Sequence, residues 1–349
     1  MKRICRIGLD IAKNKFHIHA VDQHDKDLLS KQLPRKDVLS FFATIPVCVI
    51  GLEACGGAHY WARELAKFGH ETRLLAPRAV KPYVLNNKTD AADARAICEA
   101  ASRPSLRTVQ VKSVEQQDIG AWHKIRERKV KERTALANQI RGLLHEYGII
   151  MPQGISYVRK QLPVIVEDLN NILSSCARDY FSELYSEFVE LNLLIAKYEA
   201  RILAMAKNHE DCKRLLKIPG VGPLTATAIV AHVGNASHFK NGRDFSAYLG
   251  LTPKEHSSGG KQRLLGITKR GNIYLRKLLI QGSRVVLHWS RIKAHPEMGW
   301  RKKWLLSIAD RRGPFVAAVA QANKTARIIW AVLAHGIEYQ PTLDNISNQ

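Results

Sequence analysis

The sequence Arg-Ile-Gly-Leu-Asp-Ile-Ala-Lys at residues 6–13 decides how the first third of the chain is interpreted. A short apolar run ends there on an acid, and residues 16–21 form a second apolar run after a brief turn, which predicts two paired strands. Residues 47–52 are apolar throughout and suit a buried, parallel strand. Alternating helix and strand patterns follow at about residues 57–69, 71–75 and 90–101. Such alternation predicts an α/β domain whose sheet is covered on its faces.

Strand patterns stop at about residue 112. Within residues 179–208, apolar side chains recur at gaps of four and three residues, which is a heptad seam. Its members are Leu184, Phe188, Leu191, Ile195, Tyr198, Ile202 and Met205. The same spacing continues upstream at Leu136, Ile140, Leu143 and Tyr147. The pattern predicts two long helices that pair within one chain or across a dimer interface, and we favour the dimer.

A glycine-rich turn opens the C-terminal region. Residues 218–222 read Ile-Pro-Gly-Val-Gly between two apolar helical stretches. Glycines allow a tight turn, and the amides at the start of the second helix can face a phosphate. The pattern indicates a helix-hairpin-helix-like motif, with a plain turn between two core helices as the alternative.

The charge composition indicates what kind of molecule this chain binds. The 349 residues carry 54 Lys plus Arg against 31 Asp plus Glu, a formal charge of +23. Residues 254–303 contain 13 basic and two acidic side chains, so this stretch alone carries +11. Such an excess indicates a polyanionic partner, most commonly nucleic acid.

Apolar runs and cysteines exclude other classes. No apolar run approaches 18 residues and the N-terminus lacks an apolar signal segment, so we expect neither a membrane protein nor a secreted one. The six cysteines contain no Cys-x-x-Cys, which argues against a zinc knuckle and a disulfide framework and fits reduced thiols in the cytoplasm.

Four acids form the candidate catalytic set. Asp10 and Glu53 each end an apolar strand, while Asp90 and Asp93 share one face of a predicted helix. Each acid alone is explained by a strand-end turn, a helix cap or a surface charge. Together they can converge around a pair of divalent cations such as Mg²⁺, which prefers oxygen ligands and stabilises charge on a phosphodiester.

The four acids and the segments around them resemble those of a known protein family. The order Asp10, Glu53, Asp90, Asp93 resembles the DEDD set of the RuvC-like, RNase H-type domain of IS110-family insertion-sequence transposases. This family includes Piv/MooV-type DNA invertases and bridge-RNA-guided recombinases. Residues 87–94, Asn-Lys-Thr-Asp-Ala-Ala-Asp-Ala, are close to its signature, and residues 8–14 are similar to its IS1111-like branch. Further similar segments lie at residues 218–222, 249–253, 257–259 and 266–276.

A serine-containing loop spans residues 252–266. Its Ser-Ser-Gly-Gly core is typical of a flexible surface loop. The resemblance implies that Ser258, the serine before Gly259, is the nucleophile that joins covalently to DNA. Ser257 is the adjacent competitor, and His256 could act as a base, although a solvated loop histidine is the simpler interpretation.

We therefore expect three regions: a RuvC-like DEDD domain at residues 1–108, a helical coiled-coil and oligomerisation region at 109–208, and a C-terminal transposase domain at 209–349. The resemblance implies a DNA transposase or site-specific recombinase, in which Mg²⁺ (or Mn²⁺) on the four acids works with Ser258. It further implies donor and target double-stranded DNA, a non-coding guide RNA, and a homo-oligomer, either dimer or tetramer. The expected location is the cytoplasm, at the nucleoid.

Several basic residues are expected to contact nucleic acid, namely Lys88, Lys254, Lys261, Arg263, Lys269, Arg270 and Arg276. Two alternatives to the transposase stay open. One is a metal-only nuclease of RuvC type that cuts DNA junctions or strands, and the other is a non-catalytic nucleic-acid-binding protein.

Overall fold

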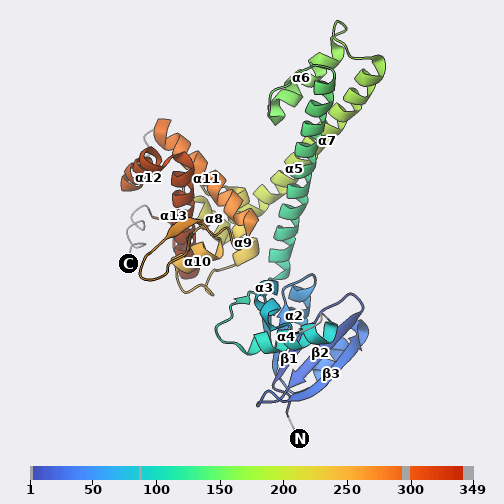
Figure 1. Ribbon diagram of the computed structural model, residues 1–349, viewed down its shortest axis with the longest axis vertical. Helices are drawn as coiled ribbons and strands as arrows, with labels where there is room; N and C mark the ends of the chain where they lie inside the picture. The colour runs from blue at the N-terminus through green and yellow to red at the C-terminus, as the bar shows by residue number, and fades with distance from the viewer. Residues whose placement is uncertain (1–2, 86–88, 293–298, 341–349) are drawn as a thin grey trace. The chain divides into compact units, whose positions relative to one another are not determined.

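The computed structural model describes residues 3–85, 89–292 and 299–340 of the chain. The chain divides into two compact units, residues 1–113 and 114–349, and each unit is described by itself (Figure 1). Lys88, one of the expected nucleic-acid contacts, lies outside the described residues.

The first unit is built on a mixed sheet with the strand order β3-β2-β1-β4-β5-β6. Its strands are β1 (Arg6–Asp10), β2 (Lys15–Val21), β3 (Asp27–Pro34), β4 (Val49–Glu53), β5 (Glu71–Leu75) and β6 (Thr108–Val109). Strands β1, β4 and β5 run parallel to one another, whereas β2 is antiparallel to β1 and β3, and β6 to β5. The α/β prediction for this region is confirmed.

Helices cover both faces of this sheet. They are α1 (Val38–Thr44), α2 (Ala58–Lys67), α3 (Pro77–Val80) and α4 (Asp90–Ser102), with 3₁₀ turns η1 (Arg35–Asp37) and η2 (Lys81–Tyr83). Helices α1 and α2 bury Phe42 and Trp61 in one cluster with Ile7 and Leu9 of β1. Because side chains alternate along a strand, Gly8 lies on the other face, and α4 covers it there.

Helix α4 lies unusually close to the sheet because two glycines share one row beneath it. Gly8 of β1 is the register partner of Gly51 of β4. A Cβ atom on Gly8 would lie 2.0 Å from the Ala94 carbonyl oxygen, and one on Gly51 would lie 2.7 Å from the Ala101 Cβ. The helix backbone therefore rests directly on the two central strands, a position that any larger residue in this row would prevent.

Arginines from the sheet hold the far end of α4. Arg6 Nε donates to the Cys98 carbonyl at 2.9 Å, and Arg73 Nη1 donates to the Ala101 carbonyl at 2.9 Å. Cations beside the last carbonyls of a helix are favoured by its dipole. At the other end, the Thr89 hydroxyl caps the helix by accepting a hydrogen bond from the Ala92 amide at 3.2 Å. The orientation of α4 is thus fixed at both ends.

The second unit begins with a pair of long antiparallel helices, α5 (Val114–Glu146) and α7 (Ser175–Asn208), joined through α6 (Ile155–Glu167) (Figure 1). The Tyr180 hydroxyl donates to the Tyr147 hydroxyl at 2.9 Å, and Arg133 Nη1 donates to Asn192 Oδ1 at 2.9 Å. The upstream seam of α5 and the first three seam residues of α7 share one cluster, which contains Leu136, Ile140, Leu143, Tyr147, Leu184, Phe188 and Leu191.

This pairing decides between the two alternatives for the seam. Leu136, Ile140, Phe188 and Leu191 are buried in one cluster of the same chain. The chain supplies its own complementary helix through residues 147–174, which include α6. A subunit contact through the buried part of this seam is therefore not supported.

The remaining elements form a mainly helical body. They are α8 (Glu210–Leu216), α9 (Pro223–Val233), α10 (Gly242–Tyr248), β7 (Pro253–Glu255), β8 (Leu264–Ile267), α11 (Ile273–Ile292), α12 (Gly299–Arg312) and α13 (Pro314–His335). Helices α9, α11 and α13 share one buried core. None of the helices in the described ranges is both long enough and apolar enough to cross a bilayer.

The glycine turn between α8 and α9 packs against α11. Gly220 has a φ of +85°, and a Cβ on Gly282 of α11 would lie 2.0 Å from the Gly220 carbonyl oxygen. The turn therefore has a packing role, as the plain-turn interpretation requires. Nearby, His123 of α5 joins three helices, since its ring nitrogens lie 2.9 Å from the Tyr274 hydroxyl of α11 and 2.9 Å from the Thr227 hydroxyl of α9. Burial lowers the pKa of His123 to about 4, so this link is uncharged at neutral pH.

Adding one methyl group at Gly8 tests the contact between α4 and the sheet. We predict that Gly8→Ala lowers the free energy of unfolding by about 2 kcal/mol or more, because overpacking at a backbone contact forces α4 to move. Urea denaturation followed by circular dichroism measures the loss. The matched control is Gly56→Ala, because a Cβ there meets no atom within 4 Å. Equal unfolding midpoints for the two variants would contradict the contact.

Candidate functional site

Two of the four predicted acids end neighbouring parallel strands. Asp10 is the last residue of β1 and Glu53 the last of β4, and the preceding residues, Leu9 and Leu52, are register partners. Alternation along the strands places Asp10 on the same face as Gly8, and Glu53 on the same face as Gly51. Both carboxylates therefore belong to the face that α4 covers.

The other two acids lie in the first turn of α4. Thr89, not Asp90, is the helix cap, so the aspartates are not needed for that role. Asp93 directly precedes Ala94, the residue that contacts Gly8, and this brings the start of α4 to the carboxyl edge of the central strands. The close approach over the glycine row thus delivers Asp90 and Asp93 to the edge that carries Asp10 and Glu53.

Electrostatics indicate that the four carboxylates form one cluster. The pKa of Asp10 is raised from its ordinary value of 3.8 to about 6. Burial is the largest cause, and the negative charges of Asp93, Asp90 and Glu53 add to it in that order. All three of the other acids are therefore close enough to Asp10 to oppose its ionisation.

The donor set suits a hard divalent cation. Carboxylate oxygens are the ligands that Mg²⁺ and Mn²⁺ favour, and a cation among the four acids would offset the repulsion that raises the pKa of Asp10. As the side chains stand, no three Asp, Glu, His or Cys groups among the described residues are arranged to hold an ion. Binding would require side-chain rotations around a backbone frame that is already in place.

The serine segment is an ordered hairpin rather than a flexible loop. Strands β7 and β8 pair antiparallel, and Ser258 pairs with Lys261 at the tip. Gly259 and Gly260 have φ values of +56° and +75°, the left-handed conformation of a two-residue hairpin turn that glycine tolerates best. The Lys261 amide donates to the Ser258 carbonyl at 3.1 Å and closes the turn. Ser258 therefore lies at an exposed tip.

The two adjacent serines differ in their hydrogen bonds. The Ser257 hydroxyl donates to Glu255 Oε1 at 2.6 Å and accepts from the Arg263 amide at 3.3 Å, so it stabilises the hairpin. The Ser258 hydroxyl has no hydrogen-bond partner within the described ranges. Of the two, Ser258 is the one available to a ligand.

Most of the basic residues singled out from the sequence are on the surface. Those with exposed side chains are Lys254, Lys261, Arg263, Lys269 and Arg270. Arg276 differs, because it is buried and its Nη1 donates to the Leu249 carbonyl at 3.0 Å and the Arg270 carbonyl at 2.7 Å. Arg276 thus lies in the interior, where it holds the segment around Arg270, rather than at the surface that a nucleic-acid contact needs.

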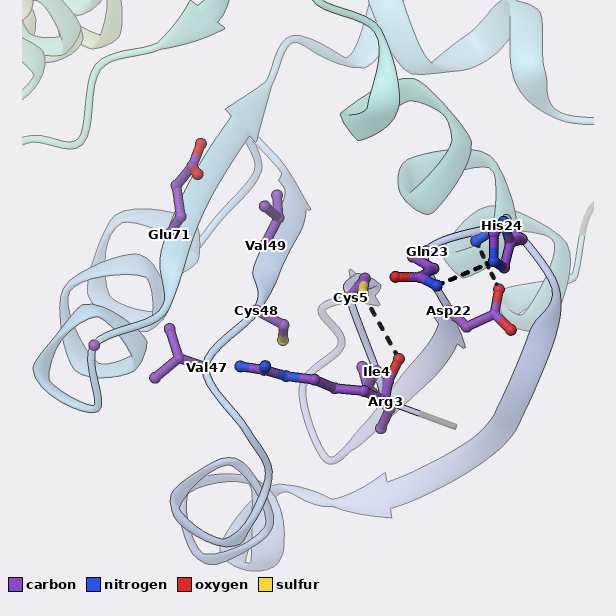
Figure 2. Close-up of a pocket in the computed structure, with 11 residues that line it drawn as sticks. Arg3, Ile4, Cys5, Asp22, Gln23, His24, Val47, Cys48, Val49 and Glu71 are labelled. Carbon is purple, nitrogen blue, oxygen red and sulfur yellow. Dashed lines mark hydrogen bonds between the residues drawn. The ribbon is translucent and has the colours of Figure 1, made fainter. Parts of the chain in front are cut away.

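A hollow lies at the other end of the parallel strands of the first unit, away from the four acids. It has a volume of about 680 Å³ and is lined by residues such as Cys5, Asp22, His24 and Cys48 (Figure 2). Burial raises the pKa of the Cys48 thiol to about 12, so this thiol is protonated at neutral pH and is a poor nucleophile. We therefore assign the candidate site of this unit to the four acids.

The raised pKa of Asp10 predicts how stability depends on pH. Folding raises this pKa from 3.8 to about 6, so the folded state binds the proton more tightly and loses stability as the pH rises through that interval. In a chelating buffer, Asp10→Asn should therefore gain melting temperature relative to wild type between pH 4 and pH 7. Thermal scans across this range measure the difference. The control Asp37→Asn should track wild type, and a constant difference for Asp10→Asn would contradict the clustering.

Two family profiles match the chain. Residues 7–149 match a profile described as a transposase, of the DEDD type of IS110, and include all four acids. Residues 212–297 match a profile described as "Transposase IS116/IS110/IS902 family" and include the serine hairpin.

Close relatives cover nearly the whole chain. A "Probable family 20 transposase" of Pseudomonas aeruginosa is 46% identical over 97% of this chain and 99% of its own length. The transposase for insertion sequence element IS1111A of Coxiella burnetii is 44% identical over 97% of this chain and 92% of its own. The IS1328 transposase of Yersinia enterocolitica is 37% identical over 96% and 98%. With the acids and the hairpin placed as described, the chain belongs to the IS110 family of insertion-sequence transposases.

Proposed function

We propose that this transposase cuts and rejoins DNA through Ser258, assisted by divalent cations on the four acids, at DNA sites selected by a structured RNA. Membership of the family implies DNA cleavage and rejoining. One observation carries it: Asp10, Glu53, Asp90 and Asp93 lie at one edge of the sheet, where burial and the charges of the other three acids raise the pKa of Asp10. Acids clustered in this way repel one another, and a bound cation would offset that repulsion.

The four acids would hold Mg²⁺ or Mn²⁺. When bound, such a cation stabilises the negative charge that develops on a phosphodiester during cleavage. The chain's own contribution is the frame, in which β1, β4 and α4 fix the four backbone positions before the cation arrives. The strand and helix arrangement supports a RuvC-like, RNase H-type domain, as the resemblance implies.

The hairpin would supply the nucleophile. The Ser258 hydroxyl oxygen forms a bond to phosphorus while the bond from phosphorus to one deoxyribose oxygen breaks, and the proton of the hydroxyl ends on that leaving oxygen. The exposed cations Lys254, Lys261 and Arg263 would neutralise the phosphate oxygens. Since one ester replaces another, a new deoxyribose hydroxyl can reverse the step and rejoin the strands without external energy.

The main competing mechanism is water-driven hydrolysis at the acids alone. It would leave the hairpin with no chemical role, although its tip exposes a hydroxyl with no partner while the neighbouring hydroxyl is bonded. That contrast favours the serine. The acids belong to one unit and Ser258 to the other, so the proposal requires both units to act on one phosphodiester.

We predict that denaturing gels with labelled DNA show a protein-linked strand that protease removes. Ser258→Ala should abolish both cleavage and the linked strand, because a methyl group cannot attack phosphorus. Ser257→Ala is the matched control; it should retain the adduct with at most a modest loss of activity, since it removes only bonds within the hairpin. Asp93→Asn should lose cleavage and keep DNA binding. An active Ser258→Ala enzyme, or cut strands free of protein, would establish the metal-only nuclease.

Guidance by RNA is proposed from the charge and the resemblance. A formal charge of +23 favours binding to polyanions, and an RNA beside the DNA would add to the phosphates available to it. The exposed basic residues of the hairpin, together with Lys269 and Arg270, offer phosphate contacts. An oligomer, dimer or tetramer, would assemble on surfaces other than the buried part of the heptad seam.

We predict that the purified protein binds a folded RNA transcribed from its own element and depends on it for recombination. The affinity should fall steeply between 50 and 200 mM salt, roughly a hundredfold or more, as counterion release requires. Removing RNA with nuclease and repurifying the protein should stop recombination, and adding the transcript back should restore it. Full activity after RNA removal would overturn this part of the proposal.

A further inference from the structure

The second unit contains a groove that the proposed chemistry does not use. Its volume is about 960 Å³, and its walls come from the base of the hairpin, from α12 and from the first half of α13. Leu264 and Leu265 of β8 form one side, while Trp300 and Trp304 of α12 form another. Phe315, at the start of α13, has 74% of its surface exposed at the end of the groove.

Cations accompany these rings. The Lys324 ammonium lies 4.3 Å from the centre of the Trp300 ring, and Arg312 and Arg327 also line the groove. Among the described lining residues there is no acid. A groove that combines aromatic faces with positive charge is complementary to a ligand that has both flat rings and negative charge.

A smaller basic hollow adjoins the groove at Phe315. Its volume is about 190 Å³, and Arg284, His288 and Arg291 of α11 line it together with the Phe315 ring. Their spacing of four and three residues places them on one face of the helix. The Arg284 guanidinium lies 5.9 Å from the centre of the Phe315 ring, so this ring is shared by the two sites.

We propose that the groove and hollow together bind an unpaired stretch of a DNA strand, with a base against Phe315 in the groove and adjacent phosphates on Arg284 and Arg291. Single-stranded nucleic acid is held elsewhere by this combination of stacking platform and basic track. An apolar peptide, or a second copy of this basic chain, brings little negative charge to the arginines that line the groove and the hollow, whereas a nucleotide strand brings both flat rings and phosphates. The inference rests on the action of the protein on DNA.

The groove favours DNA over RNA. Its lining is mainly Leu, Ile, Val, Ala, Phe and Trp, which suit base faces and the thymine methyl group that uracil lacks; the polar side chains are Arg312, Asn323, Lys324 and Arg327. Asn323 is one of the few polar side chains, and its Nδ2 already donates to the Leu251 carbonyl at 3.1 Å. We therefore assign the site to a deoxyribose strand.

Fluorescence anisotropy of the full chain in a chelating buffer tests the site, with a labelled 15-nucleotide oligothymidylate, its duplex with oligoadenylate, and oligouridylate of equal length as probes. Phe315→Leu keeps an apolar side chain but removes the ring, and should weaken single-strand binding about tenfold with less than a twofold effect on the duplex. Phe315→Tyr keeps the ring and should bind like wild type. Arg284→Gln combined with Arg291→Gln should reduce the salt dependence of single-strand binding.

Two controls separate this site from the proposed chemistry. Phe68→Ala, an exposed ring of the first unit, should change nothing, and Asp93→Asn should bind the single strand normally although it cannot cut. Unchanged single-strand affinity in Phe315→Leu would overturn the proposal, as would an equal loss for the duplex. A larger loss for oligouridylate would assign the groove to RNA. A shift from dimer to monomer in Phe315→Leu, measured by light scattering, would assign it to a second copy.

Discussion

The candidate site depends on a backbone contact between α4 and the two central strands. Gly8 and Gly51 share one row of the sheet, and the absence of their side chains lets α4 rest on the strand backbones. This close approach sets the height of Asp90 and Asp93 above the edge where Asp10 and Glu53 end their strands. Arg73, the register partner of Gly51, bonds the far end of the helix and completes the row. A carboxylate cluster is thereby held by packing that involves none of the carboxylates.

That cluster is electrostatically unfavourable without a cation. The like charges and partial burial that raise the pKa of Asp10 to about 6 oppose the ionised state that the apoprotein has at neutral pH. The packing around Gly8 and Gly51 therefore has to outweigh this repulsion, and a frame built from backbone contacts and buried apolar side chains can do so. A bound divalent cation would convert the repulsion into a binding energy, since it interacts with the folded arrangement and not with the dispersed acids of the unfolded chain.

The sequence predicts the parts of this site that depend on local pattern. Apolar runs ending in acids indicate β1 and β4, and two strands of one sheet that end on acids bring them to one edge. Strand β3 and helix α1 were missed, because an edge strand such as β3 has mostly exposed side chains and little alternation. The partner of the heptad seam could not be predicted, since periodicity specifies a face and not the chain that covers it. The burial of Arg276 and the groove around Phe315 depend on segments far apart in sequence, and no local spacing signals them.

The hairpin connects the two proposed ligand sites of the second unit. Its tip carries Ser258, which pairs with Lys261 of the other strand. Two glycines with a left-handed backbone follow Ser258, and they add no side chains beside its hydroxyl. Its base carries Leu264 and Leu265, which form one side of the groove. Lys261, the cross-strand partner of Ser258, is three residue steps from Leu264, a length on the order of 10 Å in an extended strand. A DNA strand held in the groove would therefore lie within a few nucleotides of the proposed nucleophile. Strand binding and strand attack would then be functions of opposite ends of one short β-ribbon.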